Sequence, residues 1–169
     1  MKLSLDEIED WQTFEDLIAS YFRSAQELSE NNLIDVLVEA SGIGSDGGRD
    51  ILLTFSVNDS ILTYKRKWLV QCKFYRKSVA KKHLATVNIP TLIHEYGADG
   101  YLLVVKNSTT SKVTEMFENL RKNCKLKYDY MIWDRSILES KFLVKEQLIQ
   151  QYFPKYHSYS QQIKKNINS

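Results

Sequence analysis

The 169-residue sequence contains only two prolines, two cysteines, three histidines and six glycines, and these shortages exclude several classes of protein. Cys72 and Cys124 are too few for a disulfide framework, and neither belongs to a CxxC or Cys/His spacing that would indicate structural zinc. The histidines are scattered, with no pair four residues apart, so they support neither a zinc site nor a Ser/His/Asp triad. We therefore expect a reduced protein of the cytoplasm.

Long hydrophobic runs are also missing from the sequence. No stretch approaches 18 consecutive apolar residues, and the first residues lack the apolar run of a signal peptide, so we expect no membrane association. With 43% hydrophobic residues, the chain is long enough for one sizeable core, and we expect one domain over residues 1–154. Residues 155–169 are polar, and we interpret them as a tail or the start of a linker.

The charges are unevenly distributed along the chain, although the net charge of +2 does not by itself indicate a nucleic-acid binder. Residues 1–30 carry eight acidic and two basic side chains, whereas residues 65–82 carry eight basic and no acidic ones. We call residues 65–82 the basic segment. Most runs of like charge are simply solvated, but this one can also meet a polyanion.

Hydrophobic spacing predicts the secondary structure. Apolar residues recur every three or four positions from Leu5 to Phe22, Trp11 among them, which predicts an amphipathic helix with Ser4 and Glu7 as its capping box. Strands are expected near residues 34–38, 50–55, 67–75, 101–105 and 129–133. Further helices are expected at residues 79–96, from the Ser/Thr-rich cap at 108–111 to about 123, and at 136–152, before Pro154.

The order of these elements predicts the fold class. A hairpin in the first half and strand–helix alternation in the second half predict a three-layer α/β/α sandwich around a central mixed sheet. The run 101–105 is apolar throughout, which is typical of a strand covered on both faces. Pro90 should start, end or kink a segment within the helical stretch 79–96.

The most distinctive segment is the loop 41–48, which holds four of the six glycines, including the adjacent Gly47 and Gly48. Glycine permits unusual backbone angles or the close approach of another group. Asp50 follows this loop, about one hairpin upstream of Gln71 and Lys73. An antiparallel partner strand can bring the Asp50 carboxylate beside Gln71 and Lys73, which point to the same side of their strand.

Metal-dependent hydrolysis of a phosphodiester requires such a set of groups. A carboxylate holds a hard cation such as Mg²⁺, which polarises the phosphoryl oxygen and acidifies a bound water. A lysine orients that water or neutralises the developing charge. The alternative is that Gln71 and Lys73 are only the solvated face of an edge strand, which describes most Gln-x-Lys tripeptides.

Three motifs occur in a specific order: Trp11-x-x-Phe14-Glu15, the residues GSDGGRD at 44–50, and VQCK at 70–73. In these motifs the sequence resembles the Mrr-like restriction endonucleases of the PD-(D/E)xK superfamily, and the resemblance extends over about residues 5–153. It implies a restriction-endonuclease-like fold. It also implies that Asp50 binds a metal, that Gln71 takes the place usually held by Glu or Asp, and that Lys73 is the catalytic lysine.

The resemblance assigns roles to neighbouring groups as well. Glu15 resembles an acidic residue that such nucleases place on the first helix, facing the site, but it can equally be an ordinary surface glutamate. The main-chain carbonyl of Cys72 is a further candidate ligand. Asp46 either reaches the metal or stabilises the glycine loop through an Asx turn. Gln71, a neutral amide, is a poorer metal ligand than a carboxylate, although Mrr-like members commonly carry it.

The part of the basic segment that follows Lys73, together with the next residue, is expected to contact DNA phosphates without reading the base sequence. The residues assigned to this contact are Arg76, Lys77, Lys81, Lys82 and His83.

The first functional hypothesis is a type IV-like restriction endonuclease that cuts double-stranded DNA with Mg²⁺, or with Mn²⁺ in its place, as a restriction or anti-phage defence effector. Because a double-strand cut needs two active sites or two encounters, we expect a homo-oligomer, or a chain fused to a sensor or NTPase domain. The alternative is a catalytically inactive nuclease-fold module that binds nucleic acid or a partner protein.

Overall fold

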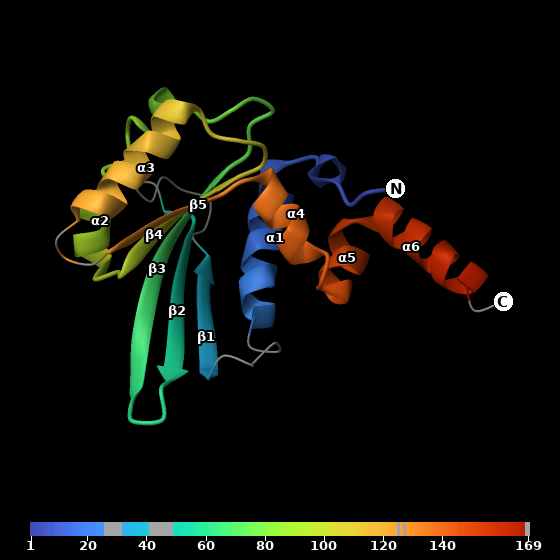
Figure 1. Cartoon of the computed structure of the whole chain (residues 1–169), viewed down its shortest axis with the longest axis horizontal. Helices are drawn as coiled ribbons and strands as arrows, with labels where there is room; N and C mark the ends of the chain where they lie inside the picture. Colours follow the sequence, from blue (N-terminus) through green and yellow to red (C-terminus); the bar gives the residue numbers. More distant parts are fainter. Residues whose placement is uncertain (26–31, 41–48, 125, 127, 168–169) are drawn as a thin grey trace.

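A computed structural model describes residues 1–25, 32–40, 49–124, 126 and 128–167. The predicted loop residues Asp46, Gly47 and Gly48 lie outside these described residues. Three consecutive strands follow the first α-helix, helices and strands then alternate, and three consecutive helices end the described chain (Figure 1). The strands are β1 (Leu33–Ala40), β2 (Ile51–Asn58), β3 (Thr63–Lys73), β4 (Gly100–Val105) and β5 (Asp129–Trp133). The α-helices are α1 (Trp11–Arg23), α2 (Ile89–Tyr96), α3 (Ser111–Asn123), α4 (Arg135–Phe142), α5 (Glu146–Tyr152) and α6 (Pro154–Ile167), and the 3-10 helices are η1 (Leu5–Glu7) and η3 (Lys81–Leu84).

The five strands form one mixed sheet in the order β1-β2-β3-β4-β5. The pairs β1–β2 and β2–β3 are antiparallel, and the pairs β3–β4 and β4–β5 are parallel. Helices α2 and α3 cover one face, while α1, α4 and α5 cover the other, as Figure 1 shows. The predicted three-layer sandwich around a mixed sheet is confirmed. None of the helices in the described part of the chain has the length and hydropathy that a membrane span requires.

Alternate side chains of the central strands enter two separate hydrophobic cores, as the pleat of a strand dictates. In β3, Leu69 packs in the core under α2 and α3, whereas Val70 and Cys72 pack in the core under α1, α4 and α5. All residues of β4 are buried, which confirms the prediction of a strand covered on both faces. The strand β3 therefore lies at the centre of the molecule, between two apolar layers.

Gly100 fixes the register between β3 and β4. It pairs with Trp68, and a Cβ atom at position 100 would lie 2.7 Å from Cζ3 of the Trp68 ring. The same register places Lys73 opposite Val105, and the next N–H, that of Lys106, donates to the Lys73 carbonyl at 3.0 Å. Because a slip of one residue exchanges the two faces of a strand, this close contact also sets the faces of the residues near Lys73.

The first helix starts later than predicted. Residues Leu5–Glu7 form η1, and α1 begins at Trp11, where Asp10 accepts a hydrogen bond from the Thr13 N–H at 2.7 Å. The predicted capping box of Ser4 and Glu7 is therefore wrong: Ser4 caps only η1. Trp11, expected on the buried stripe, is 44% exposed because it stands at the first position of the helix.

The C-terminal elements also differ from the prediction. The single helix expected over residues 136–152 is divided into α4 and α5, and Pro154 begins α6, where its missing N–H is tolerated. Most of the segment interpreted as a polar tail or linker is thus helical, although α6 has no buried residue. Glu7 caps this helix, because its carboxylate accepts hydrogen bonds from the N–H groups of Lys155 at 2.8 Å and Tyr156 at 3.1 Å.

The helix predicted over residues 79–96 is divided as well. Its first part contains only η3, and α2 begins later, with Asn88 as cap and Pro90 in its first turn. Pro90 thus starts a segment, which is one of the three expected outcomes. Thr110 is the N-cap residue of α3, within the predicted Ser/Thr-rich stretch, but its side chain makes no capping hydrogen bond.

Replacement of Gly100 tests the register contact. We expect Gly100→Ala to lower the free energy of unfolding by about 1–3 kcal/mol, because the new methyl group overpacks the Trp68 ring. Urea denaturation monitored by circular dichroism measures this loss, and a second substitution, Trp68→Leu, should recover part of it. Gly97→Asn is the control, since Gly97 has φ 55° with open space around it, and asparagine tolerates this conformation. Equal urea midpoints for Gly100→Ala and the wild type would contradict the prediction.

Candidate active site

Asp50 lies where strand β3 extends past the end of β2. The last β2 pair joins Ile51 to Val70, and β3 continues for the residues up to Lys73. The Asp50 N–H donates to the Val70 carbonyl at 2.9 Å, and its carboxylate accepts a hydrogen bond from the Cys72 N–H at 2.5 Å. The structure therefore brings Asp50 beside residues 71–73, as the hairpin argument expected.

The main chain of Cys72 faces the same side as Asp50. In a strand, the N–H and C=O of one residue point in the same direction. Because the Cys72 N–H points at Asp50, its carbonyl oxygen also faces the β2 side of β3. The Cys72 side chain instead enters the α1 core, where burial, followed by the charges of Asp50 and Glu15, raises the pKa of the thiol. Cys72 can thus contribute an oxygen ligand, while its thiol stays a neutral core group.

Gln71 does not lie on a solvated face. It is 2% exposed and stands on the central strand of the sheet, so the reading of Gln71 as part of an exposed edge strand is wrong. Its Oε1 accepts a hydrogen bond of 2.7 Å from the hydroxyl of Tyr101, which is fully buried on β4. A buried tyrosine hydroxyl needs a polar partner, and Gln71 provides it. This hydrogen bond holds the Gln71 amide in the layer of α2 and α3.

Glu15 approaches the site from the opposite face of the sheet. It is half-buried on α1, next to Phe14, whose ring lies 5.7 Å from that of Phe74. The pKa of Glu15 is raised to about 7, because burial and then the negative charge of Asp50 raise it by more than the ammonium group of Lys73 lowers it. These interactions place Glu15, Asp50 and Lys73 in one electrostatic group, so Glu15 is not an ordinary surface glutamate.

The donor set at this point fits a hard divalent cation. Within the described residues, no three histidine, cysteine or acidic side chains gather as a ready metal cluster. The site instead offers the carboxylates of Asp50 and Glu15 and the main-chain carbonyl of Cys72, all of which are oxygen ligands. The mutual repulsion of the two carboxylates is what a bound cation would relieve.

The basic segment does not form one continuous surface. Arg66 is near the opposite end of β3 from Lys73, where it pairs with Asp129 and packs over the Trp68 ring. At a rise of about 3.3 Å per residue, the seven residues from Arg66 to Lys73 span roughly 23 Å. The basic side chains of Lys65, Arg66 and Lys67 are therefore remote from the site.

The residues predicted to contact DNA follow the carboxyl end of β3. Four of these side chains are exposed to solvent: Arg76, Lys77, Lys81 and Lys82. His83 differs, because its ring stacks on Tyr75 with centroids 4.5 Å apart, and its Nδ1 accepts a hydrogen bond from the Ala80 N–H at 2.9 Å. His83 thus orders the turn that carries the lysines.

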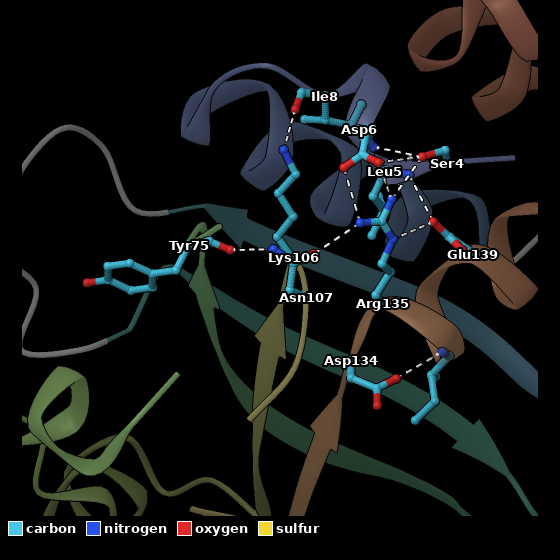
Figure 2. Close-up of polar contacts among 11 residues, drawn as sticks. Ser4, Leu5, Asp6, Ile8, Tyr75, Lys106, Asn107, Asp134, Arg135 and Glu139 are labelled. Carbon is cyan, nitrogen blue, oxygen red and sulfur yellow. Dashed lines mark hydrogen bonds and ion pairs between the residues drawn. The ribbon is translucent and has the colours of Figure 1, made fainter. Parts of the chain in front are cut away.

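Sequence reasoning missed a polar network at the ends of β4 and β5 (Figure 2). The Asn107 amide donates to the Tyr75 carbonyl at 2.7 Å and accepts a hydrogen bond from Arg135 at 3.1 Å. Arg135 also binds the Asp6 carboxylate, at 2.7 and 3.1 Å, and Glu139 at 2.9 Å. The network ties the N-terminal segment to the loop after β3, and its only sequence signal is that polar residues follow wholly apolar strands.

The raised pKa of Glu15 predicts how stability depends on pH. Below pH 4.5 Glu15 is protonated in both the folded and the unfolded chain, whereas between pH 4.5 and about 7 only the folded protein keeps the proton. Stability of the metal-free protein should therefore fall as the pH rises through this window. We expect Glu15→Gln to melt close to the wild type at pH 5 but at a higher temperature at pH 8, in EDTA. Glu118→Gln, an exposed substitution on α3, is the control, and a lower melting temperature of Glu15→Gln at pH 8 would disprove the assignment.

Comparison with known proteins gives consistent results. A family model named Mrr_cat, described as a restriction endonuclease, matches residues 5–132. A search of curated proteins gives no match. The fold is similar to the MspJI restriction endonuclease in complex with a 27-mer oligonucleotide, with a TM-score of 0.54 and 16% identity, over 86% of this chain and 29% of that one. The DNA modification-dependent restriction endonuclease AspBHI gives a TM-score of 0.47 and 12% identity, over 84% and 38%.

This chain therefore spans well under half the length of either neighbour. The family model covers more than half of this chain, and it confirms the resemblance found in the sequence motifs. The chain belongs to the Mrr_cat family of restriction endonuclease domains.

Proposed function

We propose that this chain is a metal-dependent endonuclease domain that hydrolyses phosphodiester bonds of double-stranded DNA. The observation that carries the proposal is the electrostatic group of Asp50, Glu15 and Lys73 beside the carboxyl end of β3. Two carboxylates and a lysine at one point supply both a cation site and a group for the attacking water. Membership of a restriction endonuclease family supports the same reaction.

The metal would be held by Asp50, Glu15 and the Cys72 carbonyl, with Mg²⁺ as the natural ion and Mn²⁺ as a substitute. When bound, such an ion polarises the scissile phosphate and makes a bound water more acidic. The sequence placed Gln71 among the metal ligands. We propose instead that Gln71 shapes the wall of the site, because its amide is held by the hydroxyl of Tyr101. Lys73 orients the attacking water or neutralises the charge that develops on the phosphate.

The substrate and biological setting follow from the family and from the charge of the surface. MspJI, whose fold this chain shares, is a restriction endonuclease solved with an oligonucleotide. The exposed residues Arg76, Lys77, Lys81 and Lys82 would contact the DNA backbone next to Lys73, which makes affinity dependent on salt. We assign the domain to type IV-like restriction or anti-phage defence in the cytoplasm, acting as a homo-oligomer or fused to a sensor or NTPase domain.

Substitution of Asp50 and Lys73 tests the reaction. Asp50→Asn keeps an acceptor for the Cys72 N–H but loses the charge, and Lys73→Met keeps the aliphatic stem but loses the ammonium group. We expect each to reduce plasmid cleavage in Mg²⁺ or Mn²⁺ by about 100-fold or more, since loss of one transition-state contact typically costs that much. Lys122→Gln, at the end of α3, is the control. Cleavage by both variants at the wild-type rate would rule out this active site, and DNA binding without cleavage by the wild type would select the inactive-module alternative.

Tyr101→Phe tests whether the buried hydrogen bond positions Gln71. Removal of the hydroxyl leaves the Gln71 amide without its donor, so we expect a stability loss of about 1–3 kcal/mol. We also expect kcat to fall roughly tenfold with KM unchanged, because the wall of the site is misplaced while DNA contacts remain. Tyr130→Phe is the matched control, since the hydroxyl of this buried tyrosine donates to Cys124 and its ring lies in the same core. If both variants cleave equally well, Gln71 has no positioning role.

A further inference from the structure

A polar cleft of about 680 Å³ opens beside Phe74, on the face of the sheet that α1 covers. Three basic side chains line it: Arg76 from the loop after β3, Lys106 after β4, and Arg135 at the start of α4. Two acidic side chains, Asp6 and Glu9, line the opposite wall. Figure 2 shows Lys106 and Arg135 reaching toward the N-terminal segment from neighbouring strands.

Lys106 is the unusual member of this group. It is only 8% exposed, and lysine is almost never buried unless it is paired with an acid. Its Nζ donates one hydrogen bond, to the Ile8 carbonyl at 2.7 Å, and lies 4.1 Å from the centroid of the Phe74 ring. An ammonium group has three donors, and neither of these contacts neutralises its charge. Among the described residues, no carboxylate forms an ion pair with Lys106.

Neither of the two carboxylates that line the cleft forms an ion pair with this cation. Both terminal nitrogens of Arg135 donate hydrogen bonds to the Asp6 carboxylate, so the charge of Asp6 is paired mainly with Arg135. Burial lowers the pKa of Lys106, Asp6 raises it, and the charges of Arg135 and Arg76 lower it again. Lys106 and Arg76 thus share a cleft in which Glu9 is the one carboxylate not bound by Arg135. An incoming anion would relieve this excess of positive charge.

We propose that Lys106 and Arg76 together bind one backbone phosphate of the DNA, next to the phosphate that is cleaved at Lys73. The proposal rests on the endonuclease function proposed above. The cleft adjoins the active site through two backbone connections, since Phe74 follows Lys73 and the Lys106 N–H donates to the Lys73 carbonyl at 3.0 Å. Phosphates recur about every 3.4 Å of helix axis along one strand, so a strand bound at Lys73 carries its neighbouring phosphates past Phe74.

The proposed contact with this neighbouring phosphate gives a reason for a buried lysine at position 106. A methionine would fill the same space and pack on Phe74 without the cost of burying a charge. The contact would also hold the DNA strand in line with the attacking water, because two fixed phosphates define the direction of a strand where one does not. Arg135 would not touch the DNA; its five N–H donors are used within the protein, where they hold the wall of the cleft.

The experiment measures how DNA affinity depends on salt. A fluorescent 20-base-pair duplex is titrated with the full chain in EDTA, which prevents cleavage, at several NaCl concentrations. The variants are Lys106→Met, Arg76→Gln and their combination, with Lys122→Gln as a control that removes a remote positive charge. Loss of one phosphate contact should lower the slope of log affinity against log salt by about one, and the affinity by about tenfold. Because both side chains hold the same phosphate, the double variant should lose about one in slope rather than two.

The outcomes separate the proposal from a structural role and from the function itself. A destabilised Lys106→Met that binds with the wild-type slope would show that Lys106 only supports the fold, and it would overturn the proposal. Arg76 is exposed, so Arg76→Gln gives the same test if Lys106→Met does not fold. Additive slope losses in the double variant would mean two separate phosphates and would also overturn it. If the wild-type protein neither binds nor cleaves DNA, both the proposed function and this inference are wrong. If the wild type is active and the variants bind DNA with the wild-type affinity and salt slope, only the inference is wrong.

Discussion

The site depends on a difference in length between two neighbouring strands. β2 begins at Ile51, whereas its partner β3 runs on to Lys73, so the end of β3 presents main-chain groups past the edge of β2. A buried N–H without a partner costs about 1–3 kcal/mol, and the Asp50 carboxylate removes this cost at Cys72. The same hydrogen bond fixes where the carboxylate lies. One side chain therefore completes the sheet and places a carboxylate at the proposed metal site.

The second carboxylate, that of Glu15, lowers the stability of the protein when no cation is bound. Glu15 is held by the packing of α1, with Phe14 against Phe74, and not by any affinity for Asp50. Burial is the main reason why the pKa of Glu15 is raised to about 7; the negative charge of Asp50 adds to this rise, and Lys73 offsets it only in part. Two neighbouring acidic side chains that are half-buried reduce the stability of the folded protein, as active-site residues commonly do. A site of this kind gains most when a cation or a proton is present.

The sequence predicted the strands better than the helix ends. Buried strands leave a local signal, because runs such as residues 101–105 are apolar throughout. The C-terminal helix α6 was missed because the partner that caps it is distant in sequence: Glu7 accepts a hydrogen bond from the N–H of a residue 148 positions later. The sequence placed Gln71 in the site but left a solvated face open as the alternative, because its buried partner Tyr101 lies on another strand. Lys106 gave no signal, because a lysine after a strand usually marks the surface.

The positive charge of the site is explained by where basic residues lie at the edge of the sheet, and not by how densely they occur in the sequence. β3, β4 and β5 are parallel, so their carboxyl ends meet at one edge, where ligands bind in open α/β sheets. Lys73, Lys106 and Arg135 stand at or just after these three ends, although more than sixty residues separate the first from the last. Lys65 and Arg66 are much closer to Lys73 in sequence, yet they lie near the other end of β3. Topology, rather than the density of basic residues in the sequence, therefore decides which positive charges gather at this edge of the sheet.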